Sequence, residues 1–343
     1  MEPTLSRKER KAKVASDATP RTTLSFYRYV RIGEPAAFRD AFFARLQELG
    51  CLGRIYIASE GINAQMNVPT ENFDAFRDYI DSLGELGDVP FKIAVEEGEA
   101  PSFYKLTIKV KERIVADGVA NGVFDVTAPG DYLTAKEFND YVHDPEAIVV
   151  DMRNAYESEV GHFKGAVLPQ VETFREELAI TPELLKGKED AKIALYCTGG
   201  IRCEKASAWL KHKGFKDVKH LKGGIIDYKR QVDEEGLENT FRGKNFVFDE
   251  RLGERISDEV IATCHLCAKE KADVHHHCKN QACHILFIGC DDCTKKRKGY
   301  CSRVCEFKDA LPQPVKKFLN KNIHTKRPAQ FKKNRMRPTT ATN

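Results

Sequence analysis

Apolar residues in the first third of the chain recur with two different spacings, which predict strands and helices in turn. Short apolar runs and alternation predict strands over residues 24–30, 53–58, 62–68, 91–95 and 106–110. A spacing of three to four residues predicts two helices, over 71–83 and over 35–49, where Phe38, Phe42, Leu46 and Leu49 share a face. The order βαββαβ, whose last strand the pattern leaves open, predicts a ferredoxin-like α+β domain over residues 25–116.

A second pattern begins near residue 132 and continues to residue 235. Thr134 is placed to cap a helix over 134–142. Apolar runs at 148–150, 192–195 and 218–221 predict buried strands, each followed by a turn or a helix. The polar, Gly- and Pro-containing stretch 117–131 is the predicted linker between the two domains.

Cys197 stands where the strand predicted over 192–195 ends and before a helix predicted over 204–211. Two glycines follow within three residues, so several backbone N–H groups can converge on the cysteine sulfur. Those donors and the positive end of the helix favour a thiolate over a thiol, and Arg202 adds a permanent cation. A candidate cradle for an anionic sulfur or a bound oxyanion is thus formed by Thr198, Gly199, Gly200, Ile201 and Arg202. The alternative is a buried cysteine in an ordinary turn between strand and helix.

Four motifs in order resemble a rhodanese domain over residues 132–235. They are Asp151-x-Arg153, Glu157-x-x-x-Gly161-His162-x-x-Gly165-Ala166, Cys197-x-x-Gly200-x-Arg202 and Gly223-Gly224. The resemblance implies an α/β domain with a parallel sheet, in which Cys197 forms a persulfide and residues 198–202 form its cradle. It also implies that Asp151, Arg153 and His162 are supporting framework rather than reactants. Thr198 stands where many rhodaneses have arginine, which weakens the case for simple thiosulfate sulfurtransfer.

Cysteines crowd the C-terminal part of the chain, within a segment expected to form a separate module over 236–310. The eight are Cys264, Cys267, Cys278, Cys283, Cys290, Cys293, Cys301 and Cys305. Two Cys-x-x-Cys pairs with further cysteines predict structural zinc, one or two ions, because zinc takes four such ligands. Histidines that could replace a thiolate leave the partition open: His265, His275, His276, His277 and His284. Unliganded thiols are the alternative, and the usual iron–sulfur spacings are not matched.

Basic residues gather at the two ends of the chain, over 1–24 and 311–343, and both ends are expected to be disordered. The tail has no acidic residue after Asp309 and predicts contact with RNA phosphates through Lys316, Lys317, Lys326, Arg327, Lys332 and Lys333. A solvated tail without a partner is the alternative. The chain has no apolar run long enough for a membrane span and no apolar signal core near Met1, so a reducing cytoplasm is expected.

The whole chain from about residue 25 to 310 is similar to the rhodanese-domain tRNA uridine hydroxylases. The motifs that carry this similarity, beyond the cysteine loop and cluster, lie at 26–29, 53–57, 60–64, 110–115 and 243–251. The resemblance implies oxygen-dependent hydroxylation at C5 of the wobble uridine, with molecular oxygen as co-substrate and the tRNA anticodon loop as partner. No flavin, haem or NAD fingerprint accompanies these motifs, so the electron donor stays unassigned.

Two chemical roles are open for Cys197 in such a reaction. Its thiolate could add to C6 of uracil and make C5 nucleophilic, or an oxidised sulfur could relay oxygen. Cys203 could be a resolving thiol or a small packing residue. Competing functions are persulfide sulfurtransfer to tRNA thiolation or to small molecules, and a zinc-stabilised RNA-binding adaptor without catalysis. The turn 59–63 could contact a nucleotide or be an ordinary β-turn.

Overall fold

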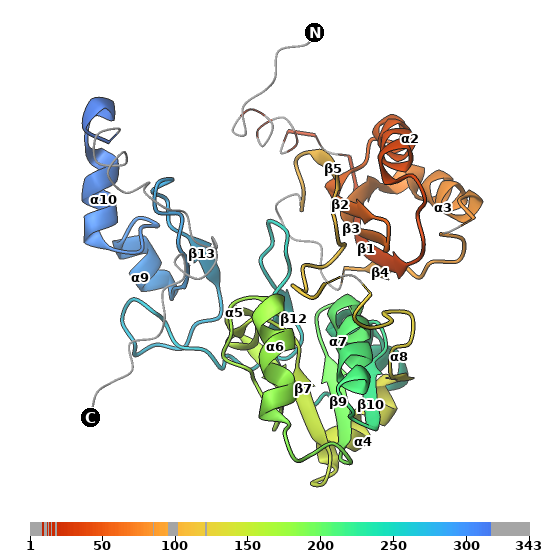
Figure 1. Cartoon of the computed structure of the whole chain (residues 1–343). Helices are drawn as coiled ribbons and strands as arrows, with labels where there is room; N and C mark the ends of the chain where they lie inside the picture. Colours follow the sequence, from red (N-terminus) through yellow and green to blue (C-terminus); the bar gives the residue numbers. More distant parts are fainter. Residues whose placement is uncertain are drawn as a thin grey trace.

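The computed structural model describes residues 19–316 apart from 85, 95–101 and 121, and five isolated positions before them: 9, 12, 14, 16 and 17. Figure 1 shows three units along this part of the chain: an N-terminal sheet with two helices, a central sheet wrapped by helices, and a C-terminal module to one side. None of the helices in these residues has the length and apolar character that a bilayer crossing requires.

The N-terminal unit is a five-stranded sheet in the order β4-β1-β3-β2-β5. Its elements are β1 (Arg21–Tyr29), α2 (Pro35–Glu48), β2 (Leu52–Ala58), β3 (Gly61–Pro69), a 3-10 turn (Thr70–Asn72), α3 (Phe73–Ser82), β4 (Lys92–Ile93) and β5 (Leu106–Val110). The ferredoxin-like prediction is confirmed: β4 closes the βαββαβ unit beside β1, and β5 extends the opposite edge parallel to β2.

The two faces of this sheet differ because strand residues alternate in direction. Phe42 of α2 and Phe76 of α3 cover one face, where they join a buried apolar core with the inward residues of the strands. The other face carries polar and aromatic side chains in cross-strand rows. One row is Tyr27, Asn63 and Tyr56, and the next is Lys92, Ser25, Gln65 and Arg54. This second face looks toward the central unit.

The central unit is a parallel sheet in the order β6-β10-β9-β7. Its strands and helices are β6 (Asp131–Leu133), α4 (Ala135–His143), β7 (Ile148–Asp151), α5 (Ala155–Ser158), β8 (Gly161–Phe163), α6 (Phe174–Leu184), β9 (Lys192–Tyr196), α7 (Ile201–His212), β10 (Asp217–Leu221) and α8 (Gly224–Glu235). Apolar residues of α4 and α8 fill one face of the sheet, and those of α6 and α7 fill the other.

Local sequence explains two helix starts in this unit. Thr134 caps α4 as predicted, since its side chain accepts the Glu137 N–H in a capping box with Glu137. The helix predicted over 204–211 begins three residues earlier, at Ile201. Gly200 is its N-cap with φ of 97°, a conformation that glycine adopts at little cost and that lets the helix start directly after the cysteine loop.

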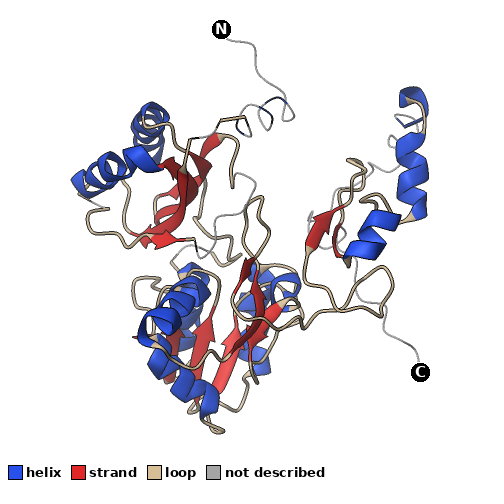
Figure 2. Cartoon of the chain, turned by 180° about the vertical axis from the view of Figure 1, so that it is seen from behind, coloured by secondary structure: helices blue, strands red, loops and turns tan. Residues whose placement is uncertain are grey.

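The chain after α8 returns to the central unit before it enters the C-terminal module. Strand β11 (Phe241–Asn245) pairs antiparallel with β8 and with β12 (Glu254–Arg255). The module itself contains β13 (His275–His277), β14 (Leu286–Ile288), α9 (Asp291–Lys296) and α10 (Arg303–Ala310), seen from behind in Figure 2. Two side-chain contacts join the module to the preceding part of the chain. His265 lies 2.6 Å from Glu159, and Arg255 lies 2.7 Å from Asp273.

Candidate functional site

The Cys197 loop is built by the ends of β9, α7 and α8. Cys197 Sγ accepts a hydrogen bond from the Gly200 N–H at 3.1 Å. The first N–H groups of α8 donate to the loop carbonyls, with Ile225 on Cys197 O at 3.0 Å. A Cβ at Gly224 would lie 2.5 Å from the Cys197 carbonyl oxygen, so the Gly-Gly motif is required for α8 to dock on the loop.

Arg202 of the cradle is held by a buried carboxylate. Its guanidinium donates to both oxygens of Glu157, at 2.7 and 2.9 Å, and to Thr198 Oγ1 at 3.2 Å. Burial would lower the pKa of Arg202, but Glu157 raises it well above its usual value, so the side chain stays charged. The pair fixes the cradle, while the carboxylate balances most of the arginine charge. Glu157 begins the second of the four rhodanese-like motifs, but the sequence alone did not show that it pairs with Arg202.

Cys197 is set to ionise near neutral pH although it is fully buried. Burial by itself would raise its pKa. Hydrogen bonding from the Cys203 thiol, the charge of Arg202, and the N–H groups of Cys203 and Gly200 together lower the pKa of Cys197 to about 6. Burial and the neighbouring Cys197 raise the pKa of Cys203 well above its usual value. The two cysteines therefore form a thiolate and a thiol, with Cys203 placed as the donor.

A further acidic group in this region was not anticipated from the sequence. Glu177 on α6 is fully buried, and neither carboxyl oxygen has a hydrogen-bond partner within the described part of the chain. Burial raises the pKa of Glu177 well above its usual value, although Arg202 lies near enough to oppose this. Burial therefore favours the neutral form of this carboxyl group.

The hydrogen bonds of Asp151, Arg153 and His162 join groups around β7, β8 and β9. They do not involve the cysteine sulfur. Arg153 donates to both oxygens of Asp151, at 2.9 and 2.7 Å, and to the Gly161 carbonyl at 2.6 Å. The Tyr196 hydroxyl also donates to Asp151, at 2.7 Å. His162 lies on β8 with Nδ1 at 2.8 Å from the Ser158 carbonyl. These contacts tie β7, β8 and β9 together, which supports the framework interpretation.

Replacing Arg153 by methionine is expected to destabilise the central unit by about 3–5 kcal/mol, because it leaves Asp151 charged and buried without its cation. Trp209 on α7 is the chain's single tryptophan, so its fluorescence in urea reports unfolding of this unit. The matched control is Arg242→Met, which removes a half-exposed pair with Glu259 and should cost under about 1 kcal/mol. Equal unfolding midpoints for the two variants would contradict the framework role.

A cleft of about 460 Å³ joins the cysteine loop to the polar face of the N-terminal sheet. Thr198, Gly199 and Arg202 line it from the loop, beside the buried Cys197. The remaining lining residues used below are Tyr27, Arg54, Tyr56 and Lys92 from the sheet, with Phe248 from the segment after β11. A second cleft, of about 560 Å³, shares Arg54, Tyr56 and Phe248 and extends to His277 of the C-terminal module. Each volume suits a small-molecule or nucleotide ligand.

A buried ion-pair network holds the two domains across this cleft. Lys205 on α7 is fully buried and donates to Glu60 at 3.0 Å and to Asp117 at 2.8 Å. Arg113 also reaches Glu60, at 3.3 Å. The turn 59–63 thus braces the N-terminal sheet against the helix that follows Cys197. Asp117 begins the stretch predicted as a linker, and it is packed in this network.

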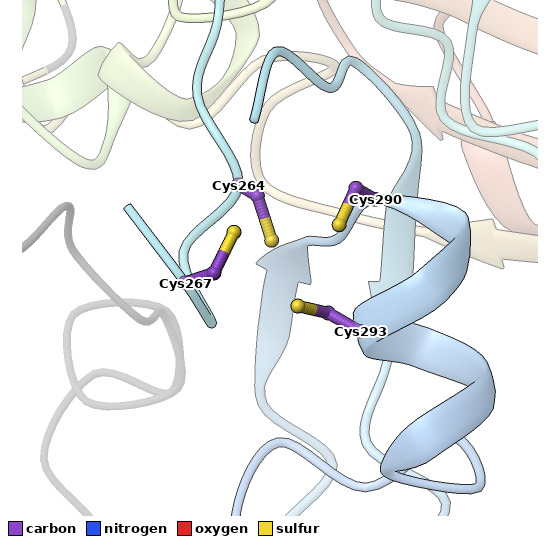
Figure 3. A group of neighbouring side chains, drawn as sticks. All are labelled: Cys264, Cys267, Cys290 and Cys293. Atoms are coloured by element: carbon purple, nitrogen blue, oxygen red, sulfur yellow. The ribbon is translucent and has the colours of Figure 1, made fainter. Parts of the chain in front are cut away.

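The eight C-terminal cysteines form two groups of four that could each hold a metal ion. Figure 3 shows the sulfurs of Cys264, Cys267, Cys290 and Cys293 turned toward one another, and the second group is Cys278, Cys283, Cys301 and Cys305. Within each group all sulfurs lie within 4.8 Å of one another. In the second group, sulfurs are separated by 3.7 Å between Cys283 and Cys301 and by 3.5 Å between Cys301 and Cys305.

These separations match the requirement of a tetrahedral thiolate site, where metal–sulfur bonds of about 2.3 Å place sulfurs roughly 3.8 Å apart. The two groups are interleaved along the chain, because the first and third cysteine pairs share one group and the second and fourth share the other. Both groups consist of cysteines alone among the described residues, and the histidines that the sequence left as possible ligands lie outside them. His265 instead bonds Glu159.

Only one residue of the predicted RNA-binding tail is described. Lys316 Nζ lies 3.2 Å from Asp309 Oδ1. Lys317, Lys326, Arg327, Lys332 and Lys333 lie outside the described residues. Their predicted contact with RNA stays a prediction.

Comparison with known proteins agrees with this three-part architecture. Family models match in sequence order: a UPF0176 acylphosphatase like domain over 21–114, a rhodanese-like domain over 134–231 and a rhodanase C-terminal region over 242–306. A tRNA uridine(34) hydroxylase of Leptospira interrogans is 53% identical over 319 residues, covering 93% of this chain and 86% of that protein. The chain belongs to the tRNA uridine(34) hydroxylase family.

Other members of the family show the same breadth of similarity. The tRNA uridine(34) hydroxylase of Photorhabdus laumondii is 47% identical over 310 residues, or 90% of this chain and 88% of that protein. That of Escherichia coli is 50% identical over 296 residues, or 86% and 84%. The assignment made from the sequence motifs is confirmed, and so is the predicted combination of a ferredoxin-like domain, matched here by the acylphosphatase like family model, a rhodanese domain and a cysteine-rich module.

Proposed function

We propose that this protein is a tRNA-modifying oxidoreductase that hydroxylates C5 of the wobble uridine to give 5-hydroxyuridine, with Cys197 as the catalytic residue. Family membership supports the reaction class. The observation that carries the assignment to this site is the cleft that joins a thiolate-stabilising loop to an open sheet face. Neither feature alone would specify a nucleic-acid substrate.

The open sheet face supplies the groups that an unpaired nucleotide needs. Tyr27 and Tyr56 flank Asn63 in one cross-strand row, and Phe248 lines the same cleft. Aromatic rings stack on exposed bases, and Arg54 in the neighbouring row offers a cation to phosphate. Anticodon-loop bases are unpaired, so turning one into the cleft costs less than extracting a base from a duplex.

Cys197 can activate the uracil ring once the base lies over Thr198 and Gly199. In one route the thiolate adds to C6: the S–C6 bond forms and the C5–C6 π electrons move toward C4 and its oxygen, which makes C5 electron-rich. In the other route an oxidised Cys197 sulfur relays oxygen to C5. Molecular oxygen is the proposed co-substrate in both. One oxygen atom ends on C5 as the C5 proton leaves, the S–C6 bond of the first route breaks as the C5–C6 double bond re-forms, and a two-electron reductant such as a thiol takes the other oxygen atom to water. Arg202 and the loop N–H groups would stabilise negative charge as it develops.

Zinc is the proposed metal for both cysteine groups, with two ions per chain. Four thiolates in tetrahedral spacing are a structural zinc set, since all positions are filled by protein. The ions would supply folding energy to the module rather than chemistry. All of the cysteines are free, which supports a reducing compartment and, with a tRNA substrate, the cytoplasm.

A second candidate function rests on the same loop. A buried thiolate whose pKa is about 6, under converging N–H groups, also suits a persulfide. Sulfurtransfer to tRNA thiolation or to a small thiol is therefore the competing proposal. Membership of the tRNA uridine(34) hydroxylase family favours hydroxylation over this alternative.

The deciding experiment is nucleoside mass spectrometry on tRNA from cells that lack this protein. Loss of 5-hydroxyuridine and its derivatives, restored by the wild-type chain, is the expected result. Purified protein incubated with that tRNA and a thiol reductant, in air and under nitrogen, should form 5-hydroxyuridine only in air. A change confined to thiolated nucleosides would replace the hydroxylase proposal with sulfurtransfer. Should a redundant pathway mask the loss in cells, the reaction of the purified protein decides.

A further inference from the structure

Lys92 brings a second cation to the cysteine loop from the other domain. It lies on β4, a strand of two residues, and pairs with Ser25 on the open face of the N-terminal sheet. Its side chain is only 4% exposed, which is rare for lysine without a specific role or partner. Lys92 also lines the cleft together with Thr198 and Gly199.

Lys92 and Tyr27 pack together over the cysteine loop. The Lys92 Cδ lies close to Gly199, because a Cβ added there would be 3.6 Å away, an ordinary van der Waals distance. The Lys92 ammonium lies 4.5 Å from the centre of the Tyr27 ring. The Tyr27 hydroxyl would lie 2.6 Å from a Cβ at Gly200, so glycine at 200 leaves room for this ring.

The charged groups that face Lys92 come from three elements. Asp227 and Arg230 lie on α8, Glu204 lies on α7, and Cys197 lies between β9 and α7. The two carboxylates have other partners: Glu204 accepts hydrogen bonds from Tyr27 at 2.8 Å and from Tyr132 at 2.7 Å, and Asp227 pairs with Arg230 at 2.9 Å. Burial lowers the pKa of Lys92, whereas Asp227, Glu204 and Cys197 favour its charged form.

A second cation would add to the effect of Arg202 on the loop. Arg202 lowers the pKa of Cys197, but Glu157 takes both branches of its guanidinium and offsets part of that charge. We propose that Lys92 is a positioning residue of the Cys197 site, which acts across the domain boundary to hold the sulfur as a thiolate. The inference rests on Cys197 being the reactive thiol of the proposed function. It makes the N-terminal domain part of the activation of the thiol as well as of substrate binding.

The test measures the pH dependence of Cys197 alkylation by iodoacetamide in the full-length protein without tRNA. Peptide-resolved mass spectrometry separates Cys197 from the other cysteines. The variants are Lys92→Met, which keeps side-chain length but removes charge, and Lys92→Arg, which restores charge. Lys216→Met is the control, because Lys216 is an exposed lysine of the central unit paired with Asp190.

In the wild type the alkylation midpoint should lie near pH 6, following the pKa of Cys197. Lys92→Met should move it upward by about one pH unit, as expected when a nearby opposite charge is lost. Lys92→Arg should recover at least half of the shift, and Lys216→Met should show none. A Lys92→Met midpoint equal to that of the wild type would overturn the proposal.

Folding and function are separated by two further readouts. The urea midpoint of Trp209 fluorescence and the near-ultraviolet circular dichroism establish that each variant is folded. If Lys92→Met does not fold, the proposal is decided by Lys92→Gln, for which the same upward shift is expected and an unmoved midpoint would overturn it. An upward shift of the midpoint in Lys92→Met, found together with a wild type that forms no 5-hydroxyuridine, would refute the proposed function and support the role of Lys92. Hydroxylation by the wild type, found together with an unchanged midpoint in Lys92→Met, would support the proposed function and refute the role of Lys92.

Discussion

Replacing Cys197 by serine is expected to lower the rate of 5-hydroxyuridine formation by at least about a thousandfold, the scale seen when a nucleophile is removed. The loop lowers the pKa of the Cys197 thiol to about 6, but the same contacts cannot ionise a serine hydroxyl near neutral pH. Both proposed routes, addition to C6 and oxygen relay by sulfur, need the sulfur. Single-turnover assays on purified tRNA, followed by nucleoside mass spectrometry, measure the loss.

The matched control is Cys203→Ser, since Cys203 is equally buried and neighbours Cys197. Serine keeps a hydrogen-bond donor for the thiolate, so the rate should fall by about tenfold or less. A drop as large as that of Cys197→Ser would instead make Cys203 the resolving thiol. Hydroxylation by Cys197→Ser at more than a tenth of the wild-type rate would refute a catalytic role for Cys197 in either route.

Much of this loop could be predicted from sequence because its parts are close along the chain. Cys197, its N–H donors and Arg202 all lie within seven consecutive residues, so strand–loop–helix order determines their geometry. The Gly-Gly motif contacts the same loop for a local steric reason at Gly224. Glycine also explains the one local error, the start of α7, because a positive φ at Gly200 allows the helix to begin three residues early.

The other half of the site depends on packing between domains, which no local pattern encodes. Tyr27, Arg54 and Lys92 are outward residues of a ferredoxin-like sheet, and their spacing would be the same on a solvent-exposed face. They line one cleft with the loop because Lys205 fixes Glu60 and Asp117 against α7. The two groups of four cysteines also depend on packing between distant segments. Cysteine spacing predicted eight ligands, but the pairing of distant segments decided which four share an ion.

Removing the metal is expected to unfold the C-terminal module while the central unit stays folded. Two thiolate sites occupy about forty residues with only small apolar clusters, so metal binding must supply much of the folding energy. Each structural zinc contributes about 10–16 kcal/mol of apparent binding energy near neutral pH. Chelation should therefore expose residues 264–305 to proteolysis, as measured by peptide mapping. The Trp209 unfolding midpoint in urea should change little, because Trp209 packs in the central core.

Single substitutions distinguish two sites from one. Cys290→Ser and Cys305→Ser remove one ligand from each group, so elemental analysis should find about one zinc per chain in either variant and two in the wild type. Cys51→Ser is the control, since Cys51 lies in the N-terminal core and should leave the zinc content at two. Full zinc content in both cluster variants would exclude the interleaved arrangement. If the chelated protein still hydroxylates tRNA, the module is dispensable for the chemistry. If the chelated protein binds tRNA more weakly, the module forms part of the RNA-binding surface. The second cleft, which extends to the module, would then belong to that surface.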